Sequence, residues 1–417
     1  MPPGRITLRD QLLLSCFWLA YNFEWGALLP VVLPHQIAAI VGDSRKELMN
    51  GLVPALGAGL SLVATPIAGA LSDRSTHPRG RRRPFLAAGT VINILFLLAL
   101  ARIAGPGGIG LFLLAWLGVQ LGANVAGGPY AGLIPDIVPA EQRGAASGWL
   151  ALMTAVGTLL GVVAAGALVG GGGYLPIYVL IASMLALFAG ITVFGVKEQR
   201  LSAAPAPFRA RAFLSSFLLR GPEYRDFFFV LFTRALVTMG IYSVFTFFQF
   251  FLHDIVRVPN AARATSYLIA IIIGLGIPTS LAAGALSDRV GRKPLVYLSG
   301  GVMALASLLF IGVGFHPSLH AMLWIGALFG IGYGAYQAVD WALAIDVLPP
   351  GESAAKDMGI WHVSLVLPQM LAPALTGAVL AALKPASLLL GYTVVFTLTA
   401  LWFILGTVFV RQIRGAR

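Results

Sequence analysis

The chain has 417 residues, of which 58% are hydrophobic and 11% are charged, and its formal net charge is +12. A soluble domain normally carries about 25% charged residues, so this composition excludes a soluble enzyme. It also excludes a disordered chain, which needs low hydrophobicity and high charge. The single cysteine, Cys16, excludes a disulfide framework and a cysteine metal site.

Long apolar runs follow one another along the whole chain. A transmembrane helix needs about 20 apolar residues, and backbone groups in lipid must be bonded within their own segment, so these runs predict helices. The alternating polarity of membrane barrel strands is absent. The sequence therefore predicts an all-α integral membrane protein. Its twelve spans are expected at about 11–33, 49–70, 84–104, 109–134, 145–168, 174–195, 227–251, 264–286, 294–315, 319–346, 357–381 and 386–411.

The basic residues predict the orientation of these spans. With a cytoplasmic N-terminus, 21 of the 28 Lys and Arg residues lie in cytoplasmic segments, 6 lie outside, and Arg234 lies within a span. Cytoplasmic loops of membrane proteins carry such an excess. We therefore expect a multi-pass protein of the cell (inner) membrane with both termini in the cytoplasm. The same distribution accounts for the positive net charge, so no nucleic acid partner is expected.

The longest polar break separates the sixth span from the seventh. Residues 196–226 contain six basic residues and two Ala-Pro pairs. We interpret this segment as a cytoplasmic linker. It would join an N-terminal six-helix bundle, residues 1–195, to a C-terminal six-helix bundle, residues 227–417.

The two predicted bundles repeat one another. Gly69-Ala-Leu-Ser-Asp-Arg74 is followed by Gly80-Arg-Arg-Arg-Pro84, and Gly284-Ala-Leu-Ser-Asp-Arg289 is followed by Gly291-Arg-Lys-Pro294. Both copies lie between the second and third spans of their half. After the fourth span of each half comes Asp136-Ile-Val-Pro139 or Asp346-Val-Leu-Pro349. Two matched pairs in register indicate an internal duplication.

The repeated loops predict a pair of cytoplasmic latches, because an Asp at a helix end can pair with Arg from the neighbouring loop. The alternative is that the arginines only fix the orientation, although orientation alone needs neither the Asp nor the Gly. The expected gating-loop residues are Gly69, Asp73, Arg74, Arg81, Arg82, Gly284, Asp288, Arg289 and Arg292.

Twelve spans in two related halves with this duplicated loop resemble the major facilitator superfamily. That resemblance implies two pseudo-symmetric bundles around a cavity that opens alternately to either side. The stretch Ser72-Asp-Arg-Ser-Thr-His-Pro-Arg-Gly-Arg-Arg-Arg-Pro-Phe85 is similar to the loop of plant sucrose and animal disaccharide–proton symporters of the glycoside–pentoside–hexuronide-like group. The stretch from Gly359 to Gln369 resembles that group too. These resemblances imply proton-coupled sugar uptake.

Ionisable residues inside spans are costly in lipid and usually mark a pathway. Glu24 lies near the middle of the first span, in Tyr21-Asn-Phe-Glu-Trp25, and a lone carboxylate there can be neutralised by a proton. The resembling symporters are thought to use a first-span Asp in a different local string. We predict that Glu24 carries the proton; a structural Glu paired to a neighbouring helix is the alternative.

Arg234 and Asp340 are the second ionisable pair. They lie about seven and six residues from the cytoplasmic ends of the seventh and tenth spans, which gives both a depth of about 10 Å. We predict an ion pair. It would either change partner as substrate binds or only hold the bundle together.

Amide and aromatic side chains within the spans are candidates for sugar contacts, because sugars present hydroxyl rims and apolar ring faces. For each of them interhelical packing is the alternative. Aligning His35 with His253 places Tyr242 opposite Glu24. The expected substrate-binding residues are Asn22, Glu24, Trp25, Gln120, Asn124, Tyr130, Tyr242, Gln249, Tyr336, Gln337, Asp340, Trp361, His362 and Gln369.

The sequence contains no nucleophile–base pair, metal cluster or nucleotide motif, so no enzyme activity, metal or cofactor is expected. Our hypothesis is a monomeric secondary transporter that takes up a small sugar, a disaccharide or glucoside, together with a proton by alternating access. One alternative is a proton-driven exporter of drugs or other amphipathic solutes on the same scaffold. Another is a non-transporting pigment- or lipid-assembly factor.

Overall fold

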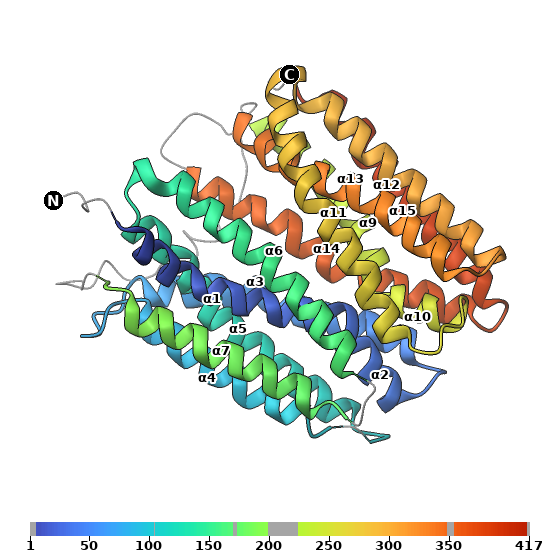
Figure 1. Cartoon of the computed structure of the whole chain (residues 1–417), viewed down its shortest axis with the longest axis horizontal. Coiled ribbons are helices and arrows are strands. Elements are labelled where there is room, and N and C mark those ends of the chain that lie inside the picture. Colours follow the sequence, from blue (N-terminus) through green and yellow to red (C-terminus); the bar gives the residue numbers. More distant parts are fainter. Residues whose placement is uncertain (1–5, 104, 170–172, 199–223, 348–353, 415–417) are drawn as a thin grey trace. The chain divides into compact units, whose positions relative to one another are not determined.

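The computed structural model describes residues 6–103, 105–169, 173–198, 224–347 and 354–414, with backbone only at 140, 288, 341, 345, 346 and 354–362 (Figure 1). The described part is helical and contains 12 helices long and apolar enough to cross a membrane. Each overlaps one of the twelve predicted spans, so the predicted all-α membrane architecture is confirmed.

The first six spans are formed by α1 (Leu8–Ala27) with the π-helical η1 (Leu28–Val32) and α2 (Leu33–Val41), then α3 (Lys46–Ser72), α4 (Arg83–Leu100), α5 (Ile109–Ile137), α6 (Arg143–Leu168) and α7 (Leu175–Gly195). The last six are formed by α9 (Arg225–Phe245) with α10 (Phe248–Asp254), then α11 (Ala261–Val290), α12 (Arg292–Phe315), α13 (Leu319–Asp346), α14 (Ala354–Leu383) and α15 (Leu388–Val408). Two short 3-10 turns, η2 (Ala140–Gln142) and η4 (Phe409–Gln412), complete the described elements.

The first span shows how the local sequence sets its helix. Thr7 caps α1, because its hydroxyl accepts from the Asp10 amide while the Asp10 carboxylate accepts from the Thr7 amide. Further along, Pro30 and Pro34 have no N–H to donate. The backbone hydrogen bonds there change from α-helical to π-helical spacing, so the Leu33 amide donates to the carbonyl of Leu28, five residues earlier.

Small residues allow α6 to lie against α1 at backbone distance. A Cβ atom at Gly157 or Gly161 would overlap the carbonyl of Leu19 or Phe23, and one at Gly26 would overlap the backbone of Thr158. Close approach through small residues is the usual way in which membrane helices gain packing contacts. The approach fixes the rotation of α1, and with it the direction in which Glu24 points.

The chain divides by internal contacts into two compact units, one of Met1–Gly42 with Leu56–Phe208, the other of Asp43–Ala55 with Arg209–Arg417. The division falls inside α3, so the first ten residues of this helix pack with the C-terminal unit. The sequence, in contrast, divides the chain only at the linker after residue 195.

Candidate functional site

Glu24 lies in α1 of the N-terminal unit and is fully buried. The side-chain amide nitrogen of Asn93, in α4, lies 3.0 Å from Glu24 Oε1 and 2.9 Å from Oε2. Among the described residues no cation forms an ion pair with this carboxyl group. Its partner is therefore a neutral amide, which leaves the carboxyl group free to exchange a proton without breaking a salt bridge.

Asn93 suits both protonation states of that carboxyl group. Its Nδ2 donates to the carboxylate, while its Oδ1 is buried and has no hydrogen-bond partner within the described part of the chain. An amide carries two donors on one side and an acceptor on the other. A rotation of the amide would therefore turn Oδ1 toward a protonated Glu24. The sequence analysis missed Asn93, because one amide in an apolar run forms no pattern.

Aromatic rings cover α1 next to Glu24. The ring of Trp18 lies between Tyr21 and Tyr130, 5.0 Å and 5.5 Å from their centroids and within 10° of both planes. Trp25 contacts Trp116 edge-on at 6.0 Å. Trp18, Tyr21 and Trp25 are each partly exposed. Spaced at i, i+3 and i+7 they form one aromatic stripe along the helix.

Hydrogen bonds hold part of this aromatic stripe in place. Trp18 Nε1 donates to Thr154 Oγ1 at 2.8 Å, and Tyr130 Oη donates to the Leu14 carbonyl at 2.9 Å. Sequence analysis named Trp25 and Tyr130 but missed Trp18 and Tyr21. Their helical spacing with Trp25 was the signal that could have found them.

The predicted amides of the N-terminal unit bind to the protein itself. Asn124 donates to the Gln120 carbonyl at 2.7 Å and accepts from Thr65 Oγ1 at 2.5 Å. Asn22 donates to the Trp18 carbonyl at 2.7 Å. Gln120 and Asn124 are buried, while Asn22 is partly exposed. Asn124 thus links α5 to α3 through Thr65, while Gln120 contacts Asn124 of its own helix.

In the C-terminal unit, Arg234 of α9 and Asp340 of α13 form a buried ion pair, with 3.5 Å between Nε and Oδ2. Tyr336 Oη donates to the other carboxylate oxygen of Asp340 at 3.0 Å. The positive charge of Arg234 balances the negative charge of Asp340, whereas the described partner of Glu24 is the neutral amide of Asn93. The buried polar groups of the two units therefore differ.

The remaining predicted contact residues of the C-terminal unit are dispersed. Tyr242 and Gln369 are partly exposed, Gln249 is buried in α10, and Gln337 is exposed and donates to Tyr333 Oη at 3.3 Å. The side chains of Trp361 and His362 lie outside the described residues. The structure does not bring the four described residues into one group.

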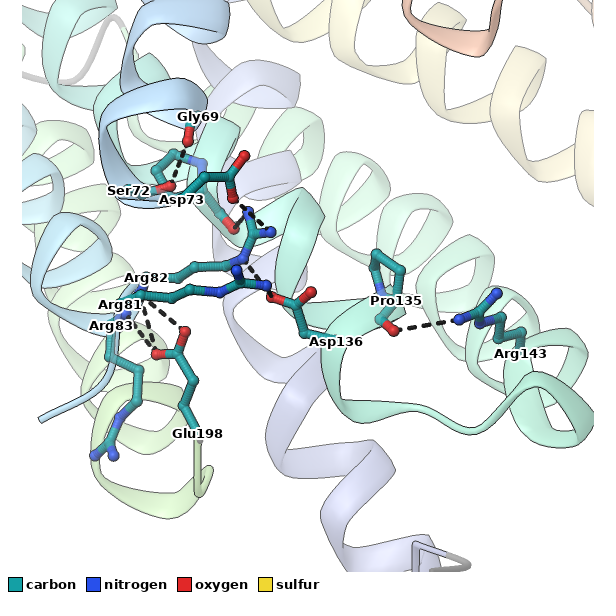
Figure 2. A network of polar contacts seen from close by, with 11 residues as sticks. Gly69, Ser72, Asp73, Arg81, Arg82, Arg83, Pro135, Asp136, Arg143 and Glu198 are labelled. Carbon is teal, nitrogen blue, oxygen red and sulfur yellow. Dashed lines mark hydrogen bonds and ion pairs between the residues drawn. The ribbon is translucent and has the colours of Figure 1, made fainter. Parts of the chain in front are cut away.

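A network of charged side chains lies at the end of the N-terminal unit where the loop between α3 and α4 runs (Figure 2). Arg82 Nη2 lies 2.8 Å from Asp73 Oδ1, and its Nε lies 2.6 Å from Asp136 Oδ2. Arg81 also reaches Asp136, at 2.5 Å. Arg82 thus connects the end of α3 to the end of α5, which is the arrangement that the latch hypothesis requires.

Arg74 and the glycines of this end of the unit make further contacts. Arg74 turns back to donate to the Ala70 carbonyl at 2.7 Å. A Cβ on Gly69 would meet nothing within 4 Å, so space does not require this glycine. A Cβ at Gly132, in contrast, would overlap the Arg82 guanidinium, so Arg82 would have to shift to accommodate it.

Glu198, just beyond α7, is the network residue that sequence analysis missed. Its carboxylate accepts from the backbone amide of Arg82 at 2.9 Å and of Arg83 at 3.2 Å, and so caps the N-terminus of α4 (Figure 2). Gly80, at φ 107°, makes room for this carboxylate. An acidic residue 116 positions from its partner gives no local signal.

The second copy of the motif has a different geometry. Helix α11 ends at Val290 and α12 begins at Arg292, so Gly291, at φ 92°, is the whole connection. Ser287 donates to the Gly284 carbonyl at 2.7 Å and accepts from Arg292, while Arg289 is exposed. The side chains of Asp288 and Asp346 lie outside the described residues.

The twelve membrane-spanning helices define a multi-pass membrane protein. The family model "Major Facilitator Superfamily" matches residues 13–355, and the chain belongs to that superfamily. Solved structures with the same fold include the transporter PepTSo, at TM-score 0.78, 10% identity and coverage of 98% of this chain and 99% of that one. A bacterial homologue of the human lysosomal transporter Spinster, in an inward-facing conformation, matches at TM-score 0.74 and 17% identity over 98% of both chains.

Curated relatives carry names that refer to drug resistance. The multidrug resistance protein MdtG of Salmonella paratyphi C is 26% identical over 349 residues, 80% of each chain. A multidrug resistance efflux pump PmrA homologue of Lactococcus lactis is 25% identical over 336 residues, covering 77% of this chain and 76% of its own. These names do not support the sugar specificity expected from the sequence.

Proposed function

We propose that the protein is a proton-driven exporter of amphipathic small molecules, with Glu24 as the residue that carries the proton. The observation that carries the proposal is the pairing of a fully buried Glu24 with a neutral amide, beside a partly exposed aromatic stripe. The drug-resistance names of MdtG and PmrA support the direction of transport and the substrate class.

The aromatic stripe suits an amphipathic solute better than a sugar. Trp18, Tyr21 and Trp25 offer flat apolar faces with an N–H or O–H at the edge, which favours stacking of planar apolar groups. Asn124 binds Thr65 and Gln120, and the side-chain oxygen of Gln120 accepts from Asn124 at 3.4 Å. Few amides therefore remain for the hydroxyl rim of a sugar.

Glu24 acts in this mechanism as a proton site rather than as a substrate ligand. Both of its oxygens bind Asn93, and the side chain has no exposed surface. Protonation removes the charge and exchanges the donor role of Asn93 for an acceptor role, which changes the contact between α1 and α4. A proton taken up from outside thus favours one conformation, and its release inside favours the other.

Proton-coupled sugar uptake is the second candidate, and the loop from Ser72 to Phe85 favours it through its resemblance to the disaccharide symporters. Both candidates share Glu24 as the proton site and place both termini in the cytoplasm of a cell membrane. They differ in the solute and in the direction of its movement.

One experiment decides between them. Proteoliposomes with an imposed pH gradient are given either a fluorescent amphipathic amine or a labelled disaccharide. Export predicts movement of the amine against the direction of proton flow, and loss of that movement in Glu24→Gln. Accumulation of the disaccharide with the protons would replace export by symport, and absence of flux for both solutes would reject both candidates.

A further inference from the structure

One face of α9 carries an arginine at the first residue of the helix and two exposed phenylalanines further along. Arg225, Phe228 and Phe232 are spaced at i, i+3 and i+7, so they lie in one stripe. The rings of Phe228 and Phe232 are stacked, with centroids 6.3 Å apart and planes 5° apart. Phe228 is 54% exposed and Phe232 is 38% exposed. This stripe therefore faces away from the interior of the C-terminal unit, with its charged end at the start of α9.

The stretch that follows α15 runs beside the first two turns of α9. The ring of Phe409, in η4, contacts Phe232 edge-on, with 5.4 Å between the centroids. Further along the chain, the backbone amide of Arg414 donates to Asp226 Oδ2 at 2.9 Å. These two contacts place residues 409–414 alongside residues 226–232. The arginines of this stretch therefore lie at the same end of the unit as Arg225.

Two buried apolar side chains determine the direction in which these arginines point. Val410 and Ile413 are 1% and 0% exposed, whereas Arg411 and Arg414 are exposed. Buried and exposed positions each recur after three residues, so both arginine side chains turn away from the interior. Basic residues that only fix the orientation of a span require no such anchoring. The anchors instead hold two positive charges at one place on the surface of the unit.

Arg225 is held in position as well. Its guanidinium carbon lies 5.3 Å from the ring centroid of Phe229, and its Nη1 lies 3.3 Å from Asp226 Oδ1. The Arg225 side chain is nevertheless 38% exposed, and a guanidinium has five N–H donors, so donors remain for a ligand. Residues 225–232 and 409–414 contain three arginines and one aspartate. This part of the surface therefore keeps a positive charge after the aspartate is paired.

We propose that an anionic phospholipid binds to this aromatic–arginine surface, which consists of Arg225, Phe228, Phe232, Phe409, Arg411 and Arg414. The arginines bind the phosphodiester, because a guanidinium pairs with phosphate oxygens through parallel N–H bonds. The phenylalanines contact the beginning of the acyl chains. Arg225 and Phe232 are about 10 Å apart along the helix, and the headgroup region is about 6 Å thick on each side of a bilayer. One lipid can therefore reach both ends of the stripe.

Charge complementarity selects an anionic lipid over a zwitterionic one. A zwitterionic headgroup brings its own cation, which the three arginines repel, whereas an anionic headgroup carries only the phosphodiester charge. The charge distribution along the sequence assigns this end of α9 to the cytoplasmic side, where the leaflet has a negative surface potential. The inference goes beyond the proposed function, because the binding of a lipid requires neither a transported solute nor a proton gradient.

The test measures lipid binding by the purified full chain in detergent. Native mass spectrometry gives the dissociation constant of the first bound dioleoylphosphatidylglycerol, with dioleoylphosphatidylcholine as the zwitterionic comparison. An arginine near an anionic lipid contributes about fivefold in affinity. Arg411→Ala and Arg414→Ala should therefore each weaken the binding of phosphatidylglycerol about fivefold and leave that of phosphatidylcholine unchanged. Arg79→Ala is the matched control, because it removes an exposed arginine that the sequence also assigns to the cytoplasmic side, and it should keep the parent affinity.

Phe228→Ala separates a lipid site from a site for free phosphate. It should weaken the binding of phosphatidylglycerol, and inorganic phosphate should not displace the lipid. Displacement by phosphate together with parent affinity in Phe228→Ala would reduce the site to one for a free anion and overturn the lipid.

Equal affinity of the parent for the two lipids would also overturn the proposal, as would equal affinity of Arg79→Ala and the Arg411→Ala/Arg414→Ala double variant for phosphatidylglycerol. The substituted arginines and Phe228 are exposed, so each variant should unfold at the parent temperature. Because lipid binding requires no transport, a failure of drug export leaves this measurement intact, and the two proposals can fail separately.

Discussion

Asn93 places one amide nitrogen within 3.0 Å of both carboxylate oxygens of Glu24, in a part of the N-terminal unit with no exposed surface on the glutamate. This relationship joins α1 to α4 through a group that can change its charge. Substitution of either residue should affect the stability of the protein and its coupling to the proton gradient in different ways.

Glu24→Gln should keep the protein stable while abolishing proton coupling. Gln has the same shape, its carbonyl accepts from Asn93, and a neutral group is less costly to bury than a charged one. We expect an unfolding temperature equal to or above that of the wild type, and at least a tenfold loss of gradient-driven transport in proteoliposomes. Gradient-driven accumulation at the wild-type rate would remove Glu24 from the mechanism.

Asn93→Ala should destabilise the protein by about 2 kcal/mol, because it leaves a buried carboxylate without its donor. The loss should be smaller in a Glu24→Gln background, where no charge remains. A double-mutant cycle on chemical unfolding in detergent measures this coupling. Equal losses in both backgrounds would show that Asn93 stabilises the fold independently of Glu24.

The glycines of the first loop motif should respond differently to alanine. Gly132→Ala should displace the Arg82 guanidinium and so weaken its ion pairs to Asp73 and Asp136. This overpacking should lower the free energy of unfolding by about 2 kcal/mol. Gly69→Ala is the control, because open space surrounds it and Ala favours a helix. Thermal unfolding of both variants checks the difference, and equal losses would contradict it.

The sequence predicts the helices of this protein better than it predicts their contacts. The length of the apolar runs and the scarcity of charges within them suffice to predict the twelve spans, because the thickness of the bilayer sets the length of any helix that crosses it. Glu24 can be selected as a candidate from the sequence too, since an ionisable group within a span is rare. Asn93 and Glu198 could not be found, because each acquires its role from a partner on another helix, 69 and 116 positions away.

The broken seventh span shows the same limit. Nothing in the run around Thr246 marks a helix end, because no Pro or Gly interrupts Phe245-Thr-Phe-Phe248. The carbonyl released there is bonded by Asn50, from a segment about two hundred positions earlier, so tertiary contact stabilises an end that local sequence does not encode.

Arg234→Met should destabilise the C-terminal unit by about 3 kcal/mol, because it leaves the Asp340 carboxylate buried without its cation. Adding Asp340→Asn should recover most of that loss, since Asn can still accept from Tyr336. Unfolding in denaturant measures both variants. If the pair also takes part in transport, the stable double variant should still be slow; transport at the wild-type rate would make the pair purely structural.

Asp43, which lies between α2 and α3, provides a prediction about pH. Hydrogen bonding to Lys46, which outweighs partial burial, lowers the pKa of Asp43 to about 2. For Lys384, partial burial lowers the pKa, but the hydrogen bonds to Glu47 and Asp43 outweigh it and leave the pKa above its ordinary value. A lowered acidic pKa contributes stability that is present above the unfolded pKa of 3.8 and is lost as the pH falls toward 2. A raised basic pKa contributes stability below its unfolded value of 10.5, which is lost only at higher pH. The difference in unfolding temperature between the wild type and Asp43→Asn should therefore stay constant from about pH 5 to 9. A difference that changes within that range would contradict the lowered pKa of Asp43.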